Sequence, residues 1–471
     1  SALTAAQMWV ELQPENLEAH QVTAALLMRE GKVDEALPHL EQVLSVDQDN
    51  SRNSYLLITS LLSKEKDKQA ALDAMDQLVA KRRHDPEALY AYAHLAMLVG
   101  SLDKAETAVN EAIGYVPNWS EAHILRANNL IRQGQNEKVM NLLQETLDSY
   151  PDDVAIRLFY ARRLVDEKRY EQSREQFSIL LDYKPDDPEA LYALGLLNLQ
   201  TDRVEEARRN FERLIELGQR VDEAYYYLGQ VAETKKDTAA AMRYYSEVRK
   251  GSNYIDAQIR IAAMLAGPGD IDAARARLQI RSAPTMDVEL RLFLAEGEIL
   301  RNANQLEEAY EVYSLGLQQM PDNSQLLYSR ALTAEKLGQI DEAINDLALI
   351  VKNEPNNAEA LNALGYTLVD MTGRVVEGKQ YVEKALRLKP NDPAILDSMG
   401  WAYYRLGEHE KALRYLQQAF NKLKDPEIAA HLGEVLWVLG NKERAREVWD
   451  EALRETPKDK VLLNVIERFA R

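Results

Sequence analysis

Small side chains recur at a nearly constant interval along this chain of 471 residues. The interval is 33 to 35 residues. A fixed period of this length is the signature of a repeat architecture, in which each unit buries its core only against its neighbours. The positions that set the period are Ala36, Ala70, Ala105, Val139, Ser173, Ala207, Ala241, Ala274, Ala309, Ala343, Gly378, Ala412 and Ala445.

A second series of small residues stands twelve residues before the first. Paired small residues let two helices approach closely, so we expect each repeat to be a hairpin of antiparallel helices. Ile58 interrupts the second series, and Gly365 is offset from it by one position. Its other members are Ala24, Ala93, Ala127, Ala161, Gly195, Gly229, Ala262, Gly297, Ala331, Gly400 and Gly433.

Prolines mark the connections between the expected hairpins. Because proline lacks an N–H and clashes with the preceding turn, a helix ends before it and the next one begins after it. The prolines at these connections are Pro14, Pro117, Pro151, Pro185, Pro321, Pro355, Pro390 and Pro457.

One stretch, PAILDSMGWAYYRLGEHEKA at residues 393–412, carries the whole pattern of one repeat. With it the chain resembles the tetratricopeptide-repeat (TPR) family over essentially its full length. The resemblance implies an all-α fold, a TPR solenoid that forms a right-handed superhelix of antiparallel helix pairs, with thirteen hairpins across residues 17–457. The residues that carry it are Leu396, Met399, Gly400, Tyr403, Gly407 and Ala412.

The two ends differ from the repeats. Residues 1–16 are expected to be the second helix of a truncated preceding repeat, since Ala2 and Pro14 fit the period run backwards. Residues 458–471 are expected to form a helix that caps the open end of the solenoid. Its expected apolar side consists of Val461, Leu462, Val465, Ile466 and Phe469.

Two segments depart from the period. Near residues 266–289, AGPGD replaces the usual turn and RSAPTMD shortens the second helix. Near residues 371–380 the turn gains a residue, and Gly378 falls inside a helix at a cost of about 1 kcal/mol relative to Ala. These segments are either local irregularities or places where the pitch changes, and we expect the larger change of inter-repeat angle at the first of them.

Composition excludes several classes of partner. The formal charge is −19, which repels a phosphate backbone, so nucleic acid is not an expected partner. Residues 393–471 contain 13 acidic and 13 basic residues, so the whole excess lies upstream of them. No apolar run is long enough to span a bilayer, no signal peptide opens the chain, and the absence of cysteine excludes disulfides and thiol chemistry.

No arrangement of residues indicates catalysis. The sequence lacks HExxH, GxxxxGK[ST], GxGxxG and GxSxG. Acidic pairs such as Asp34–Glu35 and Asp341–Glu342 stand where second helices begin, and there carboxylates favour the positive end of the helix dipole. We therefore expect no enzyme activity, no cofactor and no metal.

The inner surface is where a solenoid of this family binds proteins. Its first helices line a concave groove, into which the second, fifth, sixth, ninth, twelfth and thirteenth places of the repeat point. An aromatic and arginine-rich group there contains residue types that dominate binding hot spots, although the same side chains could instead pack on adjacent repeats. The candidate groove residues are Asn362, Tyr366, Asp397, Trp401, Tyr404, Arg405, His431, Glu434, Trp437, Tyr226, Tyr227 and Tyr90.

The last third of the chain, in particular residues 397–420 and 425–453, is similar to a group of TPR lipoproteins of Gram-negative bacteria. These are adaptors for a periplasmic carboxyl-terminal processing protease. The resemblance implies that the chain binds such a protease and its substrates, the cell-wall hydrolases, at the periplasmic side of the outer membrane. Family members are anchored through an N-terminal cysteine, so a lipid anchor is expected only on a segment preceding Ser1.

Two other functions remain open at this point. The first is a structural assembly factor for envelope export or pilus machinery. The second is a cytosolic co-chaperone, which we do not favour. Family members that grip acidic chaperone tails do so with Lys and Asn residues that clamp two carboxylates, and Phe159 stands where this clamp needs its second Asn.

Overall fold

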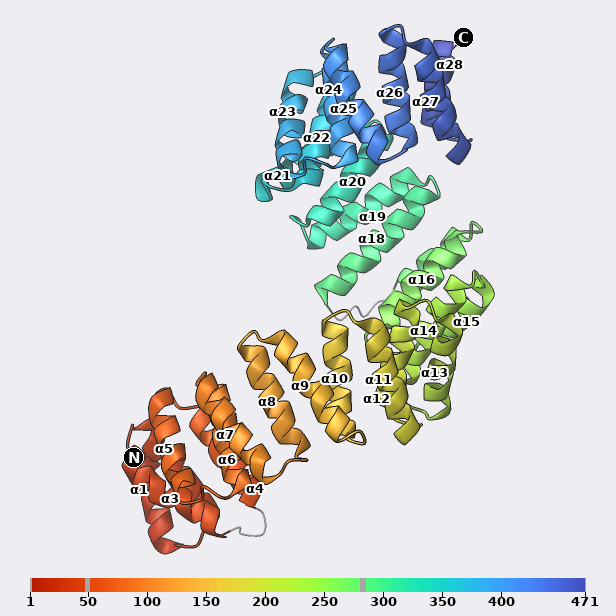
Figure 1. Cartoon of the computed structure of the whole chain (residues 1–471). Helices are drawn as coiled ribbons and strands as arrows, with labels where there is room; N and C mark the ends of the chain where they lie inside the picture. The colour runs from red at the N-terminus through yellow and green to blue at the C-terminus, as the bar shows by residue number, and fades with distance from the viewer. Residues whose placement is uncertain (1, 47–50, 280–284, 471) are drawn as a thin grey trace. The chain divides into compact units, whose positions relative to one another are not determined.

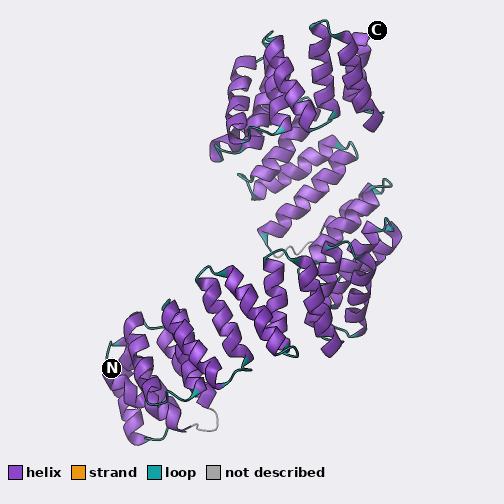
Figure 2. Cartoon of the chain, viewed as in Figure 1, coloured by secondary structure: helices purple, strands orange, loops and turns teal. Residues whose placement is uncertain are grey.

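The chain is helical throughout the part that the computed structural model describes, residues 2–46, 51–279 and 285–470 (Figure 1). These residues form 28 α-helices and no strand (Figure 2). The helices are α1 (Ala2–Leu12), α2 (Leu17–Arg29), α3 (Val33–Val46), α4 (Ser51–Ser63), α5 (Lys68–Ala80), α6 (Pro86–Leu98), α7 (Leu102–Tyr115), α8 (Ser120–Arg132), α9 (Asn136–Ser149), α10 (Val154–Asp166), α11 (Tyr170–Tyr183), α12 (Pro188–Gln200), α13 (Val204–Glu216), α14 (Val221–Thr234), α15 (Thr238–Glu247), α16 (Tyr254–Ala266), α17 (Ile271–Leu278), α18 (Met286–Asn302), α19 (Leu306–Gln319), α20 (Ser324–Lys336), α21 (Ile340–Asn353), α22 (Ala358–Met371), α23 (Val375–Leu388), α24 (Pro393–Arg405), α25 (His409–Lys422), α26 (Pro426–Val438), α27 (Lys442–Glu455) and α28 (Lys460–Ala470).

The helices group into two compact units. The first unit is Ser1–Lys236 and contains α1 to α14, and the second is Asp237–Arg471 and contains α15 to α28. Within each unit, consecutive helices pack as hairpins, for example α6 with α7 and α22 with α23. The repeat period thus builds a TPR solenoid of helix pairs in both units.

The predicted small residues lie where paired helices touch. A Cβ placed on Gly400 of α24 would meet Leu416 and the carbonyl oxygen of Ala412 on α25. In several hairpins the side chain four residues after the small residue of the second helix is a ring, which fills the space beside the first helix. Phe211, Tyr245 and Trp449 are such rings, and because they are at most 1% exposed they belong to the core.

Most turns inside the hairpins contain a residue with a left-handed backbone. Gly134 and Gly407, for example, have φ of 76° and 78°. The equivalent turns after α10 and α12 instead contain Lys168 with φ of 59° and Asp202 with φ of 58°. This conformation is sterically unfavourable for a residue with a Cβ, whereas glycine adopts it without steric cost. The turns at Lys168 and Asp202 are therefore strained.

The two irregular segments lie in the second unit. In the first, α17 spans only eight residues and the next helix, α18, spans seventeen. Residues 280–284 of the shortened segment lie outside the described part of the chain. In the second, Gly378 lies inside α23 against the Gly365 carbonyl oxygen, where a Cβ would clash. The difference of inter-repeat angle stays a prediction.

Single helices stand at both ends of the described chain. Helix α1 buries Leu3 and Ala6. Helix α28 packs on α26 and α27, with Leu462 fully buried and Val465, Ile466 and Phe469 against the same core. Val461, expected on that side, is 51% exposed, because it is offset by about 100° around the helix from Leu462.

Candidate functional site

The candidate site lies on three consecutive first helices of the second unit, α22, α24 and α26. Each begins after a capping side chain: Asn357, Asp392 and Asp425 accept backbone N–H groups of the first turn. Such caps satisfy N–H groups that have no partner inside the helix. Because the three helices start in the same register, equivalent places of the repeat come next to one another.

Helices α22 and α24 are joined through Asp370. Its Oδ1 accepts hydrogen bonds from Nε1 of Trp401, at 2.8 Å, and from Nη1 of Arg405, at 3.0 Å. The Trp401 side chain is only 8% exposed, whereas Arg405 is exposed. The indole of Trp401 is therefore held in one orientation, and Arg405 keeps a solvent-facing guanidinium beside it.

Helices α24 and α26 are joined by a buried ion pair and a ring stack. Nδ1 of His431 lies 3.0 Å from both carboxylate oxygens of Asp397. The imidazole ring also stacks on Trp401, with ring centroids 4.1 Å apart. His431 and Asp397 are both buried, so this contact is shielded from solvent.

Two tyrosines extend the network. The Tyr366 hydroxyl on α22 donates to Oε1 of Glu427 on α26, at 2.9 Å. The Tyr404 hydroxyl on α24 donates to Oε1 of Glu434, at 2.9 Å, and Glu434 also pairs with Arg468 of the last helix. Side chains thus connect α22, α24, α26 and α28 into one surface. We call it the inner cluster, and it consists of Tyr366, Asp370, Asp397, Trp401, Tyr404, Arg405, Glu427, His431, Glu434 and Arg468.

Burial and charge set the protonation of the inner cluster. Burial raises the pKa of the Tyr366 hydroxyl, and the carboxylate of Glu427 raises it further. Burial together with the bond to Glu434 raises the pKa of Tyr404 to about 12. Burial by itself lowers the pKa of His431, but the carboxylate of Asp397 outweighs it, so that the net shift is upward. The tyrosines therefore stay neutral donors at pH 7, and His431 favours its charged form.

Two further candidate residues of α22 and α26 lie at the edge of the inner cluster. Asn362 is half-buried, and its Oδ1 has no hydrogen-bond partner within the described residues. Trp437 is also half-buried, but its ring stacks on Trp449, at 5.7 Å between centroids, rather than on Trp401. Trp437 therefore presents a separate aromatic surface, flanked by the cations of Lys442 and Arg446.

Three candidate residues belong to the first unit and have aromatic neighbours of their own. Tyr90 lies 4.8 Å from Trp119 between ring centroids. Tyr226 is 9% exposed and packs edge-on against Tyr227, which stacks on the core ring of Phe211. These contacts are those of side chains packed between repeats.

Sequence reasoning missed three residues that hold the inner cluster together. Asp370 occupies the thirteenth place of its repeat and Glu427 the second, so the rule that selected the other residues also covers these two. Arg468 lies in the capping helix, outside the repeats, and the period gives no signal for it. Each of the three contacts a predicted residue: Asp370 orients Trp401, Glu427 accepts the hydrogen bond of Tyr366, and Arg468 pairs with Glu434.

The inner cluster has the chemistry of a recognition surface. Its carboxylates are bonded to Trp, Arg, His and Tyr donors, which stabilises one arrangement of aromatic and charged groups. Within the described residues there is no group of three side chains able to hold a metal ion. Likewise, none of the described helices combines the length and apolar character that a bilayer crossing requires.

Comparison with known proteins agrees with the repeat pattern. Family models described as tetratricopeptide repeat match residues 62–128, 130–197, 199–255 and 279–458. The TPR repeat-containing protein PA4667 of Pseudomonas aeruginosa is 43% identical over 438 residues, which are 92% of this chain and 73% of that protein. Tetratricopeptide repeat protein 8 of Caenorhabditis elegans is 28% identical over 38% of this chain and 36% of its own length.

Among solved structures, a tetratricopeptide repeat protein from Parabacteroides merdae aligns with a TM-score of 0.44 and 14% identity. The alignment covers 53% of this chain and 99% of that one.

Proposed function

The chain belongs to the tetratricopeptide-repeat family, whose repeats bind proteins, and we propose that it is a non-catalytic adaptor for a carboxyl-terminal processing protease. In this proposal it holds the protease and its substrates, cell-wall hydrolases, and so promotes their degradation. The resemblance of the last third of the sequence to protease adaptors supports this partner. The same resemblance supports a location at the periplasmic side of the outer membrane.

The observation that carries the proposal is the inner cluster. Trp, Tyr and Arg are the residue types that contribute most to protein interfaces. Here their orientation is fixed before any partner arrives, so less conformational entropy is lost on binding. Arg405 is exposed and Tyr404 half-buried in this cluster, and the half-buried Trp437 presents a separate aromatic surface at its edge; we assign the partner contact to these three residues.

An adaptor of this kind acts through proximity. Two proteins bound to one chain meet at an effective concentration that can reach the millimolar range. We assign one partner to the inner cluster and the other to the first unit, which carries the larger charge, with 40 acidic and 27 basic residues.

The test is a degradation assay with purified protease, a purified cell-wall hydrolase and the full chain. We expect the chain to bind both proteins and to accelerate loss of the hydrolase. The double variant Arg405→Ala, Trp437→Ala should lose one of the two partners, because it removes a charge and a ring from the surface while leaving Trp401 in place. Trp401→Ala is a poorer test, since Trp401 is only 8% exposed and its ring stacks on the buried His431.

The matched control for this assay is Arg414→Ala, which removes an exposed arginine from the second helix α25. It should bind both partners normally. If the chain binds neither protein, the adaptor function is wrong. If it forms stable complexes with envelope proteins without any effect on proteolysis, it is a structural assembly factor instead.

A further inference from the structure

Two histidines of the first hairpin are in contact, far along the chain from the inner cluster. His20 lies on α2 and His39 on α3, and their Nδ1 atoms are 2.9 Å apart. Nε2 of His20 lies 2.8 Å from the carbonyl oxygen of Pro14, in the connection that precedes α2. His20 is only 8% exposed, and His39 is half-buried. The proposed adaptor function makes no use of this buried titratable pair.

The geometry fixes where the protons of the two rings lie. A carbonyl oxygen can only accept, so Nε2 of His20 carries a proton and donates it to Pro14. In the neutral ring of His20, Nδ1 is therefore an acceptor. The proton between the rings then belongs to Nδ1 of His39. The neutral pair contains one donor and one acceptor, as a hydrogen bond requires.

The pair can hold one extra proton but not two. A proton added to Nε2 of His39 leaves the bond between the Nδ1 atoms intact. A second proton, on Nδ1 of His20, makes both Nδ1 atoms donors, so that two N–H groups face each other without an acceptor. The two charged rings also repel each other, with their centroids only 5.1 Å apart. Because a buried donor without a partner is costly, the doubly charged pair has to separate.

No carboxylate compensates the charge of the two rings. Within the described residues, neither ring forms an ion pair or a hydrogen bond with an acidic side chain. Burial lowers the pKa of His39, and the neighbouring His20 lowers it further. The charged and titratable groups on α2, on α3 and on the elements packed against them, none of which bonds to either ring, are Glu11, Glu15, Glu18, Arg29, Asp34, Glu35, Glu41, Tyr55, Lys68, Asp73 and Asp76.

A later hairpin makes the equivalent contact with groups that do not titrate near neutral pH. Arg157 follows Pro151 by six residues, as His20 follows Pro14, and its guanidinium donates to the Pro151 carbonyl oxygen. It also donates to Oε1 of Gln176, at 2.6 Å and nineteen residues later, the same separation as between the two histidines. Arginine stays charged and the amide oxygen stays an acceptor, so this contact is independent of pH in that range.

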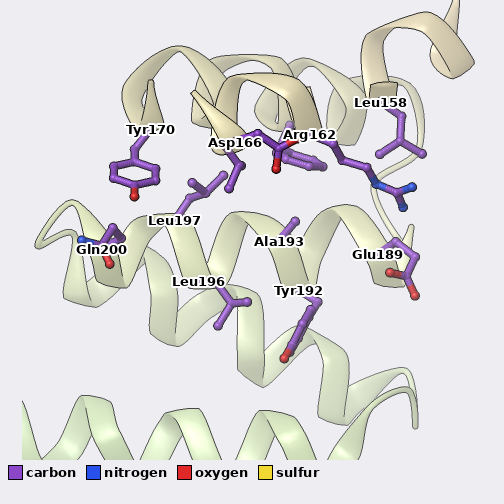
Figure 3. Close-up of a pocket in the computed structure, with 12 residues that line it drawn as sticks. Leu158, Arg162, Asp166, Tyr170, Glu189, Tyr192, Ala193, Leu196, Leu197 and Gln200 are labelled. Carbon is purple, nitrogen blue, oxygen red and sulfur yellow. The ribbon is translucent and has the colours of Figure 1, made fainter. Parts of the chain in front are cut away.

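The contact lies between the two helices of a hairpin and not in the groove. On α10, Leu158 and Arg162 line a cavity of about 590 Å³ between α10 and α12 (Figure 3), whereas Arg157 bonds to Gln176 on α11. A third hairpin has His123 at the place of His20. Its Nε2 lies 2.8 Å from the Pro117 carbonyl oxygen, but its Nδ1 has no hydrogen-bond partner within the described residues.

Of these three hairpins, only the first joins its helices through two titratable rings. We propose that His20 and His39 form an acid-sensitive latch between α2 and α3, which is closed while at most one ring is charged and opens when both are. Opening separates α2 from α3 but keeps the bond from His20 to Pro14, because Nε2 retains its proton. Mild acid therefore loosens residues 17–46, while the hairpin of α10 and α11 stays closed. The inference does not rest on the adaptor function.

The direction of the pH dependence follows from the lowered pKa of His39. A histidine in the unfolded chain titrates at about pH 6.5. A histidine whose folded pKa is lower contributes its full stabilisation above that pH and loses it as the pH falls through the folded value. The latch is therefore closed at neutral pH and opens in mild acid.

The test is hydrogen exchange of the full chain at about pH 5.5 and about pH 7.5, on either side of the usual histidine pKa. Each rate is divided by the intrinsic rate of an unstructured peptide at the same pH, so that only protection is compared. We expect the protection of α2 and α3 to fall by about tenfold or more at the lower pH, since a buried donor there loses its acceptor. The protection of α10 and α11 should change less.

Two variants separate the latch from other effects of pH. In His39→Gln, the amide can donate to the neutral ring of His20 and accept from the charged ring. The protection of α2 and α3 should then be the same at both pH values. The double variant His20→Arg, His39→Gln copies the pair of Arg157 and Gln176 and should behave in the same way. If the double variant does not fold, His39→Gln alone decides.

The matched control is His84→Gln, which makes the same substitution at an exposed histidine bonded to the Tyr115 hydroxyl. It should keep the wild-type pH dependence in α2 and α3. The proposal is wrong if the wild-type protection of α2 and α3 does not change with pH, or if it falls equally in His39→Gln. It is also wrong if a chelator at constant pH removes this protection and Zn²⁺ restores it, since the rings would then share a metal ion instead of a proton.

This test uses neither the protease nor the hydrolase. Protection that is independent of pH, together with accelerated proteolysis, would remove the latch and leave the adaptor function standing. The expected loss of protection in acid, together with no effect on the hydrolase, would leave the latch and remove the adaptor function.

Discussion

At the scale of single residues, Gly433 shows how side-chain size controls the pairing of helices. Gly433 lies on α26 directly beneath the indole of Trp449 on α27, and a Cβ built on it would overlap that ring. Trp449 is 1% exposed and has no room to move away. We predict that Gly433→Ala lowers the unfolding free energy by about 1–3 kcal/mol, the usual cost of overpacking a core, measured by urea denaturation.

The control for this prediction changes glycine to alanine where space is free. Gly114 lies exposed within α7, and a Cβ there meets nothing within 4 Å. Gly114→Ala should raise the unfolding free energy by about 0.5–1 kcal/mol, since alanine loses less backbone entropy in a helix. Equal effects of the two substitutions would contradict the packing argument.

His431 is a second residue with a measurable consequence, because its pKa is raised in the folded protein. The groups that face it are Asp397, Glu427 and Asp370, with the ring of Trp401 stacked on it. Because the pKa is raised, the stabilisation by the charged His431 imidazole is complete below the pKa of about 6.5 in the unfolded chain. It is lost as the pH rises through the folded value.

We therefore predict that the wild-type protein exceeds His431→Gln in thermal stability most strongly below about pH 6, and that this advantage shrinks as the pH rises. The measurement is a series of thermal melts of both proteins between acidic and mildly alkaline pH. Glu335, whose pKa burial raises, also titrates in the second unit but is common to both proteins. A difference that stays constant with pH would show that the imidazole charge does not contribute.

At the scale of elements, the turns within hairpins are under unequal strain. Lys168 follows α10 with φ of 59°, a conformation that costs an L-residue about 1–2 kcal/mol. Glycine avoids that cost but loses about 0.5–1 kcal/mol in backbone entropy. We predict that Lys168→Gly raises the unfolding free energy of the first unit by up to about 1 kcal/mol, detected as a higher urea midpoint.

The reciprocal change tests the same turn in the preceding hairpin. Gly134 has φ of 76°, and a Cβ there would touch nothing within 4 Å, so only the backbone opposes a side chain. Gly134→Lys should lower the urea midpoint by a similar amount. A midpoint that falls in both variants would mean that side-chain contacts of Lys168 outweigh its backbone strain.

The helix pairs could be predicted from sequence because the spacing of small residues acts within one hairpin. Gly400 and Ala412 are twelve residues apart and meet directly. The same spacing of small residues recurs in the other hairpins except at Ile58 and at Gly365, which is offset by one position. The partners of Trp401 could not be predicted in this way. Its N–H bonds to Asp370, 31 residues earlier, and its ring stacks on His431, thirty residues later. Such contacts depend on how one repeat is placed on the next.

The unequal packing of consecutive first helices was unpredicted for a related reason. The period treats all consecutive first helices as equivalent, yet α10 and α12 stand apart while α22 and α24 pack closely. Nothing in the spacing of Ala161 and Gly195 distinguishes this pair of repeats from the others. A repeat sequence therefore predicts the hairpins better than it predicts the spaces between them.

At the scale of the whole molecule, charge is distributed unequally between the two units. Residues 1–236 carry a net charge of −13 and residues 237–471 a net charge of −6. An excess of one sign destabilises a compact state through self-repulsion. The ion pairs that oppose it, such as Arg213–Asp186 and Lys389–Glu359, are largely exposed and contribute little each.

We predict that raising NaCl from about 0.01 M to about 0.5 M stabilises the protein, and residues 2–236 more than residues 237–470. Over this range the Debye length falls from about 30 Å to less than 8 Å, which screens long-range repulsion more than it weakens close pairs. Hydrogen exchange read peptide by peptide measures each unit within the intact chain. Slower exchange should be seen mainly in α2 to α14. If salt instead accelerates exchange in α2 to α14, the exposed ion pairs of the first unit stabilise it more than its net charge destabilises it.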